Sequence, residues 1–224
     1  MLPALRRAGV WRLAALVVTH GDPDHAGGLA SLLDGMPIDA AWVPAGTEEA
    51  EWQAPLVASG VPRRALGRGD RFWLGPLLVT ALHPPGGWAS DANNGSLVLR
   101  IEWGLAAVLL AGDAEAVAER SLMADGAPLG APVLKVGHHG SRHASTRPFV
   151  AAVAPRIALI SVGARNPFGH PSPAVLDRLQ AAGAAIYRTD YDGAVEVVSD
   201  GERLSVRRWA RPQLAEEWLL RAAP

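Results

Sequence analysis

Residues 19–28 read Thr-His-Gly-Asp-Pro-Asp-His-Ala-Gly-Gly and bring two imidazoles and two carboxylates within six positions. The apolar run Leu13–Thr19 before them predicts a buried strand, and residues 26–33 predict a helix. A helix cap would account for one carboxylate, but not for two carboxylates together with two histidines. His and carboxylate groups hold the metals of hydrolytic sites. The metal ligands that the stretch predicts are His20, Asp22, Asp24 and His25.

A single carboxylate, Asp113, stands between a strand predicted at Ala106–Ala111 and a helix predicted at Ala114–Ala124. Asp is favoured at helix N-caps, so a capping role is one interpretation. The other is a carboxylate that bridges two metal ions, which two-metal hydrolytic sites hold about 3.5–4 Å apart.

A histidine-rich loop follows the strand predicted at Val133–Val136, and residues 137–145 read Gly-His-His-Gly-Ser-Arg-His-Ala-Ser. Adjacent side chains after a strand point to different sides. One of His138 and His139 is therefore expected to bind a metal, and the other to orient a ligand or contact substrate. The donors that this loop offers to an anionic substrate are Ser141, Arg142 and His143.

Three further polar residues have two interpretations each. His170 lies in the loop after the strand predicted at Ile157–Ser161, and it either packs beside the next proline or meets the substrate. His83 ends a predicted strand before two prolines, and it is either structural or a further ligand. Asn94 lies in a turn and is also a candidate substrate contact.

The composition excludes several kinds of protein. The chain has 224 residues, of which 49% are hydrophobic and 19% charged, enough apolar mass for a sizeable core. It holds no cysteine, which excludes a disulfide scaffold, a Cys-ligated zinc ribbon and a thiol nucleophile. No run of about 18 apolar residues reads as a membrane span, and the N-terminus lacks the apolar region of a signal peptide. The net charge of −1 gives no overall basic field for nucleic acid.

Short apolar runs alternate with amphipathic stretches, which predicts an α/β fold with mixed sheets. Ser172 as N-cap and the proline after it predict a helix through Ala182. Asp192-Gly193 fits a hairpin turn between strands, and Gln213–Arg221 is expected to be a terminal helix. The other predicted elements are strands at Ile38–Val43, Leu77–His83, Ser96–Glu102, Ala185–Arg188, Ala194–Ser199 and Leu204–Arg208, and helices at Glu48–Ser59 and near Phe149.

The order of these motifs resembles a known family. His20-x-Asp22-x-Asp24-His25 is similar to the His-x-His-x-Asp-His motif of the metallo-β-lactamase fold, with Asp22 in place of the second histidine. Asp113 is similar to that fold's bridging Asp. More narrowly, the chain resembles the C-terminal hydrolase domain of the ComEC-type competence proteins over residues 2–198. The segments that carry this likeness are TH-D-DHAGG, NNGSLVL, LLAGDAE, LKVGHHGS, SVG-N-GHP and YRTDYDGAVEV.

The resemblance implies an αββα sandwich with a dinuclear metal site at one edge, in a nuclease that degrades the DNA strand not taken up during transformation. It implies a hydrolase domain at residues 1–208, with 209–224 as a C-terminal helical extension. Such domains belong to polytopic membrane proteins and face outside the cytoplasm. The expected location is therefore the extracytoplasmic face of the bacterial plasma membrane, the expected partner is single-stranded DNA, and the isolated fragment is expected to be soluble. In the family, strands precede the first metal motif; only 19 residues precede His20, so these N-terminal strands are expected to be missing.

On this resemblance, two divalent ions share Asp113. The expected ligands of one ion are Asp24, His25 and His139, and those of the other are His20 and Asp22. Because Asp22 replaces a histidine, the site is harder and favours Mn²⁺ over Zn²⁺. A water with a lowered pKa would attack a phosphodiester. The expected catalytic residues are Asp24 and His170, the latter as phosphate contact or leaving-group acid, and the expected substrate contacts are His138, Ser141, Arg142 and Asn94.

Two alternatives stay open at this point. One is a stand-alone hydrolase of the same fold that acts on a small phosphodiester, an ester or a lactam. The other is a DNA-binding or scaffold module without catalysis. The near-zero net charge weakens the second alternative, because nonspecific DNA affinity comes mostly from phosphate neutralisation.

Overall fold

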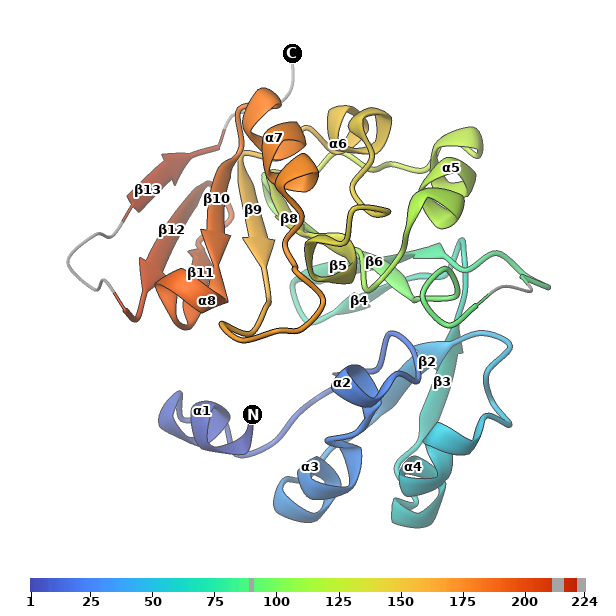
Figure 1. Ribbon diagram of the computed structural model, residues 1–224. Coiled ribbons are helices and arrows are strands. Elements are labelled where there is room, and N and C mark those ends of the chain that lie inside the picture. Colours follow the sequence, from blue (N-terminus) through green and yellow to red (C-terminus); the bar gives the residue numbers. More distant parts are fainter. Residues whose placement is uncertain (89–90, 211–215, 221–224) are drawn as a thin grey trace.

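A seven-stranded mixed sheet forms the centre of the computed structural model, which describes residues 1–88, 91–210 and 216–220 (Figure 1). Its strand order is β10-β9-β8-β7-β6-β5-β4. Strands β4 to β7 pair antiparallel, and β7 to β10 pair parallel. The strands are β4 (Arg71–Leu74), β5 (Leu77–His83), β6 (Val98–Trp103), β7 (Ala106–Leu110), β8 (Val133–Lys135), β9 (Ile157–Ile160) and β10 (Ala185–Arg188).

Three helices cover one face of this sheet, as Figure 1 shows above the strands. They are α5 (Ala116–Ala124), α6 (Arg147–Val153) and α7 (Pro173–Ala181). Leu122 and Phe149 from the helices pack against Leu109 and Leu134 from the sheet in one buried cluster. Strands β8 and β9 are short, mostly apolar and largely buried, as expected for strands covered on both faces. The edge strand β10 is only partly buried.

Two small sheets cover the opposite face of the central sheet. The first has the parallel order β1-β2-β3, with β1 (Leu16–Val17), β2 (Ala41–Pro44) and β3 (Arg63–Leu66). Its Trp42 and Leu66 share a buried cluster with Val79 and Leu99 of the central sheet. Helices α3 (Leu29–Gly35) and α4 (Ala54–Ser59) cover its outer side. Helix, sheet, sheet and helix therefore stack in four layers, the expected αββα sandwich.

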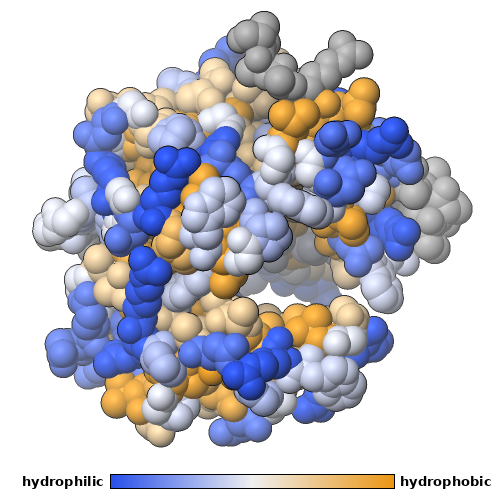
Figure 2. All heavy atoms as spheres, turned by 180° about the vertical axis from the view of Figure 1, so that it is seen from behind, coloured by the Kyte–Doolittle hydropathy of each residue, from blue (hydrophilic) through white to orange (hydrophobic). Residues whose placement is uncertain are grey.

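The second small sheet is antiparallel, with β11 (Val195–Ser199), β12 (Arg203–Arg208) and β13 (Glu216–Leu219) in that order. Leu204 and Val206 of this sheet share a buried cluster with Val133 and Ile157 of the central sheet. Among the described residues, β1 and β11 each lie at the edge of a small sheet. From behind, Figure 2 shows a hollow between the lower part, which holds α3 and α4, and the upper part.

The remaining elements are short. They are α1 (Leu2–Arg7), α2 (Pro23–Ala26), the 3₁₀ turns η1 (Glu51–Gln53) and η2 (Gly137–Gly140), and α8 (Thr189–Asp192). No helix within the described ranges combines the length and hydropathy that a bilayer span requires.

Two sequence predictions about the C-terminal part are wrong. Asp192-Gly193 does not close a hairpin, because Asp192 Oδ2 accepts a hydrogen bond from the Arg188 backbone N–H at 2.8 Å and ends α8. The hairpin lies at Asp200 instead, whose Oδ1 accepts from the Glu202 and Arg203 backbone N–H groups at 2.9 and 2.7 Å.

The terminal helix predicted at Gln213–Arg221 is also wrong where the structure describes it. Residues 216–219 form β13, because pairing with β12 brings Trp218 beside the apolar cluster that also holds Leu220. Residues 213–215 and 221 of that prediction lie outside the described residues.

Candidate metal centre

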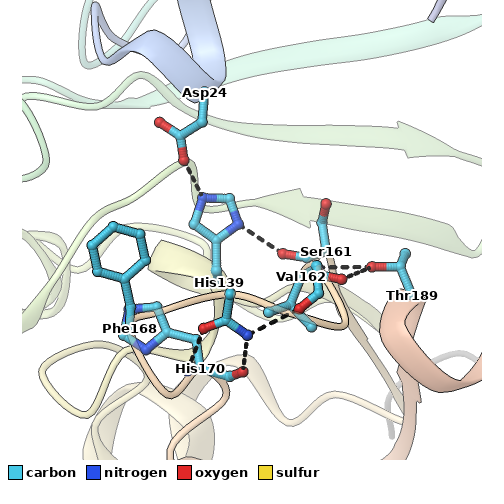
Figure 3. A pocket seen from close by; sticks show the side chains of 9 residues that line it. Asp24, His139, Ser161, Val162, Phe168, His170 and Thr189 are labelled. Atoms are coloured by element: carbon cyan, nitrogen blue, oxygen red, sulfur yellow. Dashed lines mark hydrogen bonds and ion pairs between the residues drawn. The ribbon is translucent and has the colours of Figure 1, made fainter.

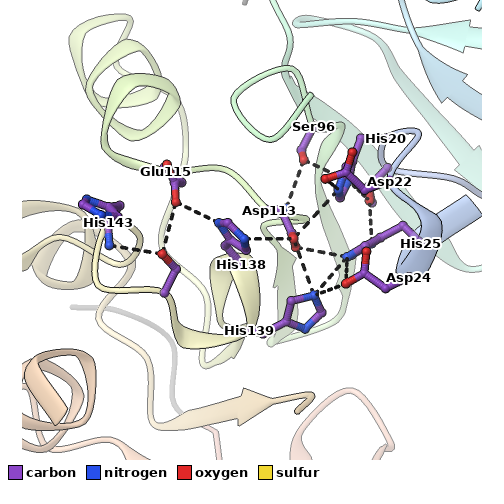
Figure 4. Close-up of polar contacts among 12 residues, drawn as sticks. His20, Asp22, Asp24, His25, Ser96, Asp113, Glu115, His138, His139 and His143 are labelled. Carbon is purple, nitrogen blue, oxygen red and sulfur yellow. Dashed lines mark hydrogen bonds and ion pairs between the residues drawn. The ribbon is translucent and has the colours of Figure 1, made fainter. Parts of the chain in front are cut away.

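The polar motifs converge because each follows a strand at the same edge of the molecule. His20 follows β1, Asp113 follows β7, and the His138-His139 pair follows β8. The loop after β9 leads to His170. Carboxyl ends of parallel strands meet at one sheet edge, where open α/β sheets hold their ligands. Figure 4 shows the first three segments pointing toward one another.

Asp113 occupies the middle of the cluster and is 2% exposed. Its Oδ2 lies 3.8 Å from His20 Nε2 and 3.5 Å from His139 Nε2, and its Oδ1 lies 3.3 Å from His25 Nε2. Its backbone N–H donates to Ser96 Oγ at 3.0 Å. The two oxygens of one carboxylate therefore face histidines from two different segments.

The second group lies toward solvent. Asp24 Oδ2 is 3.1 Å from His139 Nε2, and His25 Nε2 is 3.2 Å from the same nitrogen. His139 Nδ1 lies 2.7 Å from the carbonyl oxygen of Ser161, so Nδ1–H donates there and leaves Nε2 free to bind a metal. His139 and not His138 shares a group of mutually close ligand atoms with Asp24 and His25, which supports His139 as the ligand.

Asp22 does not act as a capping side chain. Its backbone carbonyl accepts from His25 N and Ala26 N, but its carboxylate caps no backbone N–H in the described part of the chain. Instead, Asp22 Oδ2 lies 3.7 Å from His20 Nε2. Asp22 belongs to neither of the two groups of ligand atoms that lie within 4.8 Å of one another, so Asp22 as a metal ligand stays a prediction.

The residues present fit a metal centre. Potential ligand atoms of His20, His25 and Asp113 lie within 4.8 Å of one another, and so do those of Asp24, His25 and His139. His20 Nε2 is buried and has no hydrogen-bond partner among the described residues. Buried polar atoms nearly always have a partner, and a bound cation would supply one to this nitrogen.

Electrostatics agree with ligand chemistry. Burial raises the pKa of Asp113, but the hydrogen bond and charge of His25, with the charges of His139 and Lys135, lower it to about 2. Burial lowers the pKa of His20, and the charge of His25 acts in the same direction. Both directions favour an ionised carboxylate and a neutral imidazole, the forms that bind divalent metals.

The backbone is bent to place these ligands. His138 and His139 both have positive φ values, of 44° and 52°, in the left-handed region that side chains other than Gly seldom adopt. Gly112, before Asp113, has φ +54°, and a Cβ there would lie 2.8 Å from the Cβ of Ser96. Backbone strain of this kind concentrates at functional sites.

Sequence reasoning missed Glu115 as a site residue. Its Oε1 lies 2.8 Å from His138 Nδ1, and Ser141 Oγ donates to the same oxygen at 3.2 Å. His138 Nε2 is left facing Asp113 Oδ2 at 3.9 Å. The available signal was a second carboxylate two residues after Asp113, at the start of a helix.

The structure corrects the predicted substrate contacts at Asn94 and Ser141. Asn94 is 4% exposed; its Oδ1 accepts from Glu115 N and Ala118 N, and its Nδ2 donates to Asp91. It fixes the start of α5 from outside the helix. Ser141 is 3% exposed and is occupied with Glu115. Both side chains are too buried and too engaged to meet a substrate.

His83 is a structural residue. It is fully buried, its Nε2 bonds to the Asn94 carbonyl oxygen at 2.8 Å, and its ring meets Trp88 edge-on. Burial lowers the pKa of His83 to about 4. Arg142, in contrast, is exposed, and its carbonyl oxygen accepts from Arg178. Arg142 as a substrate contact stays a prediction.

His170 is placed beside the cluster rather than in it. Its ring centroid lies 5.6 Å from that of His138, and it lines a cavity of about 430 Å³ with Asp22, Asp24 and Asp113. Burial and the charges of the two neighbouring histidines lower the pKa of His170. His170 as a phosphate contact or leaving-group acid stays a prediction.

Comparison with known proteins identifies a family whose members this chain resembles. The sequence profile of the metallo-beta-lactamase superfamily matches residues 1–164. ComE operon protein 3 of Bacillus subtilis (strain 168) is 34% identical over 200 residues, which cover 88% of this chain and 26% of that protein. Competence protein ComA of Neisseria gonorrhoeae is 36% identical over 197 residues, which cover 88% of this chain and 27% of that protein. This chain therefore spans about a quarter of the length of these relatives.

A solved structure with a similar fold is CmlA, a diiron beta-hydroxylase from Streptomyces venezuelae. The match has a TM-score of 0.57 and 16% sequence identity, and it covers 80% of this chain and 44% of CmlA. At this identity the likeness concerns the fold alone.

Proposed function

The chain belongs to the metallo-β-lactamase superfamily, and on that premise we propose that it is a metal-dependent nuclease, the hydrolase domain of a DNA-uptake protein. The observation that carries the proposal is the convergence of three histidines, His20, His25 and His139, on the two oxygens of Asp113. Asp24 lies beside this cluster, 3.1 Å from His139 Nε2. One buried atom of this cluster, His20 Nε2, lacks a hydrogen-bond partner within the described residues.

His25 belongs to both candidate ligand groups, but one imidazole nitrogen binds one ion. We call Asp24, His25 and His139 the outer group, because they lie toward solvent, and the ligands around His20 the inner group. We assign His25 to the outer group and give the inner group Asp22 as a second ligand beside His20. The ligands of the outer ion are then Asp24, His25 and His139; those of the inner ion are His20 and Asp22. Asp113 would serve both ions, because its carboxylate lies beside His25 and His139 of the outer group and beside His20 of the inner group.

When bound, two divalent ions would lower the pKa of a water and polarise the phosphodiester. Side chains of the cavity that are not assigned as metal ligands would orient the substrate. His138, with Nδ1–H held by Glu115, presents Nε2 to the cavity beside Asp113. His170 lines the same cavity and offers a contact to a phosphate oxygen.

The ligand set supports Mn²⁺ as the working metal. Three of the six assigned ligands are carboxylates, and oxygen ligands suit Mn²⁺ better than imidazole or thiolate ligands do. Imidazole also suits Zn²⁺, so elemental analysis of the purified protein decides between the two metals.

One relative is named a competence protein, and the resemblance of the motifs to the DNA-uptake family leads us to propose DNA as the substrate. We propose that the domain degrades the strand that is not transported, at the extracytoplasmic face of a membrane-embedded parent protein. With a net charge of −1, the chain offers no overall field for DNA. Binding then depends on the metals and on local groups at the site.

The test compares cleavage of single- and double-stranded DNA by the Mn²⁺-loaded protein with cleavage by its His20→Ala and Asp113→Ala variants. We expect only the wild type to cleave DNA, and we expect a chelator that removes Mn²⁺ to abolish this cleavage. Equal activity in all three proteins would overturn the metal assignment. Hydrolysis of nitrocefin or a small phosphodiester without cleavage of DNA would point to a stand-alone small-molecule hydrolase. DNA binding without metal or cleavage would point to a binding module.

A further inference from the structure

A second cavity opens beside the metal centre. It has a volume of about 420 Å³ and reaches from the outer ligands to the loop after β9, as Figure 3 shows. Residues that line it include Asp24, His139, Asn166, Phe168, His170 and Thr189. Phe168 also lines the cavity at the metal cluster. Its ring therefore stands where the reaction site and this side cavity meet.

Phe168 is 77% exposed, more than any other large hydrophobic residue described as exposed. One face of its ring stacks on His170, with centroids 6.0 Å apart and an interplanar angle of 24°. Packing within the chain does not explain so open an aromatic ring. A flat, unoccupied aromatic face at the entrance of a site is a platform on which another ring can stack.

The loop that carries Phe168 is held in place. Asn166 Nδ2 donates to the Gly163 and His170 carbonyl oxygens at 3.0 and 2.8 Å. Asn166 Oδ1 accepts from the His170 backbone N–H at 2.9 Å. One side chain thus ties both ends of the loop, so the ring is presented at little cost in conformational entropy.

Polar groups in the cavity are largely engaged. Thr189 Oγ1 bonds to the backbone N–H and carbonyl oxygen of Val162, and the Ser161 carbonyl oxygen accepts from His139. Such a lining leaves few donors or acceptors that could form hydrogen bonds with the polar edge of a nucleobase. Stacking without edge recognition is how sequence-tolerant proteins bind single strands.

We propose that this cavity holds a nucleobase next to the scissile phosphodiester, stacked on Phe168. The inference rests on the proposed nuclease function and makes it specific for unpaired strands. In a duplex both faces of a base are stacked and its edge is paired, so an intact duplex cannot place a base on Phe168. Phe168 is then a specificity-determining residue for single-stranded nucleic acid.

The test uses a single-stranded oligonucleotide with one abasic position, cut by the Mn²⁺-loaded protein and mapped bond by bond. In the wild type, the bond whose base would occupy the cavity is cut more slowly by about 5- to 150-fold, the factor that a stacked base contributes. Other bonds of the same strand serve as internal controls.

Three variants separate stacking from other effects. Phe168→Ala is expected to cut the intact strand more slowly by the same factor and to ignore the abasic position, whereas Phe168→Trp retains the wild-type pattern. Trp73→Ala, at an equally open aromatic (69% exposed) in β4 that lines neither cavity, is expected to behave as wild type. Melting temperatures confirm that all variants fold.

The outcomes distinguish this inference from the function on which it rests. If the wild type cleaves DNA but ignores the abasic position, or if Phe168→Ala keeps the abasic effect, the nucleobase cavity is refuted and the nuclease stands. If the wild type cleaves no bond of any strand, the nuclease fails and the nucleobase cavity fails with it.

Discussion

Replacing Gly112 by Ala should damage both the stability and the metal centre. Gly112 has φ +54°, and a Cβ there would lie 2.8 Å from Ser96 Cβ, 3.0 Å from Ser96 Oγ and 3.2 Å from Thr19 Cβ. The left-handed backbone costs about 1–2 kcal/mol for a residue with a side chain. Crowding in a packed interior adds about 1–3 kcal/mol, so the free energy of unfolding should fall by about 2–5 kcal/mol in total.

The same substitution also reaches the ligands, because Ser96 must move. Ser96 Oγ accepts from Asp113 N at 3.0 Å and lies 3.3 Å from His20 Nδ1. Loss of such supporting contacts typically costs metal affinity about 10- to 100-fold. Urea unfolding of the metal-free protein measures the first effect, and calorimetric titration with Mn²⁺ measures the second.

Gly126 provides a matched control. It has φ +63°, and a Cβ there would meet no described atom within 4 Å. Gly126→Ala should therefore lose only the backbone part, about 1–2 kcal/mol, and keep its affinity for Mn²⁺. If Gly112→Ala and Gly126→Ala lose the same free energy of unfolding and both bind Mn²⁺ as the wild type does, the proposed packing around Asp113 is wrong.

Further predictions concern other groups. Glu115→Ala should lower kcat about 10- to 100-fold because His138 loses its hydrogen-bond partner, whereas Glu115→Gln, which keeps an acceptor oxygen, should retain most of it; equal kcat values would count against this role. The pKa of His83 is about 4 in the fold against an ordinary 6.5, so its stabilising effect is full above pH 6.5 and is lost as the pH falls through 4. At about 1.4 kcal/mol per unit, wild type should lose about 3 kcal/mol more than His83→Gln between pH 7 and 4 in urea unfolding, and parallel curves would contradict this. Mn²⁺ at a hundredfold its Kd should stabilise the wild type by about 2.7 kcal/mol per site, and Asp113→Asn should lose this gain; an equal thermal shift in both proteins would argue against Asp113 as a shared ligand.

Local patterns predicted much of the fold. The strand Leu77–His83 has the bounds expected from its apolar run, and α7 begins after Ser172 with a proline in its first turn. The errors arose where distant contacts decide. Residues 216–219 (Glu-Glu-Trp-Leu) favour a helix by local propensity, and pairing with β12 makes them a strand instead.

The site also contains residues that local sequence identified and residues that only distant contacts define. The ligand motif lies within one loop, so residue type and spacing identified it. Asn94 illustrates what spacing cannot reveal, because its amide is used by the start of α5, more than 20 positions away. Phe168 could not be singled out either, since only the fold brings its loop beside His139 and leaves the ring open.

The most direct test of the dinuclear nuclease measures metal content and DNA cleavage on the same samples of wild type and Asp113→Asn. The wild type should bind two divalent ions per chain and cleave single-stranded DNA with Mn²⁺, and the variant should lose both properties while remaining folded. A wild type that binds no divalent ion, or an Asp113→Asn protein that cleaves DNA as fast as wild type, would contradict a metal-dependent nuclease centred on Asp113.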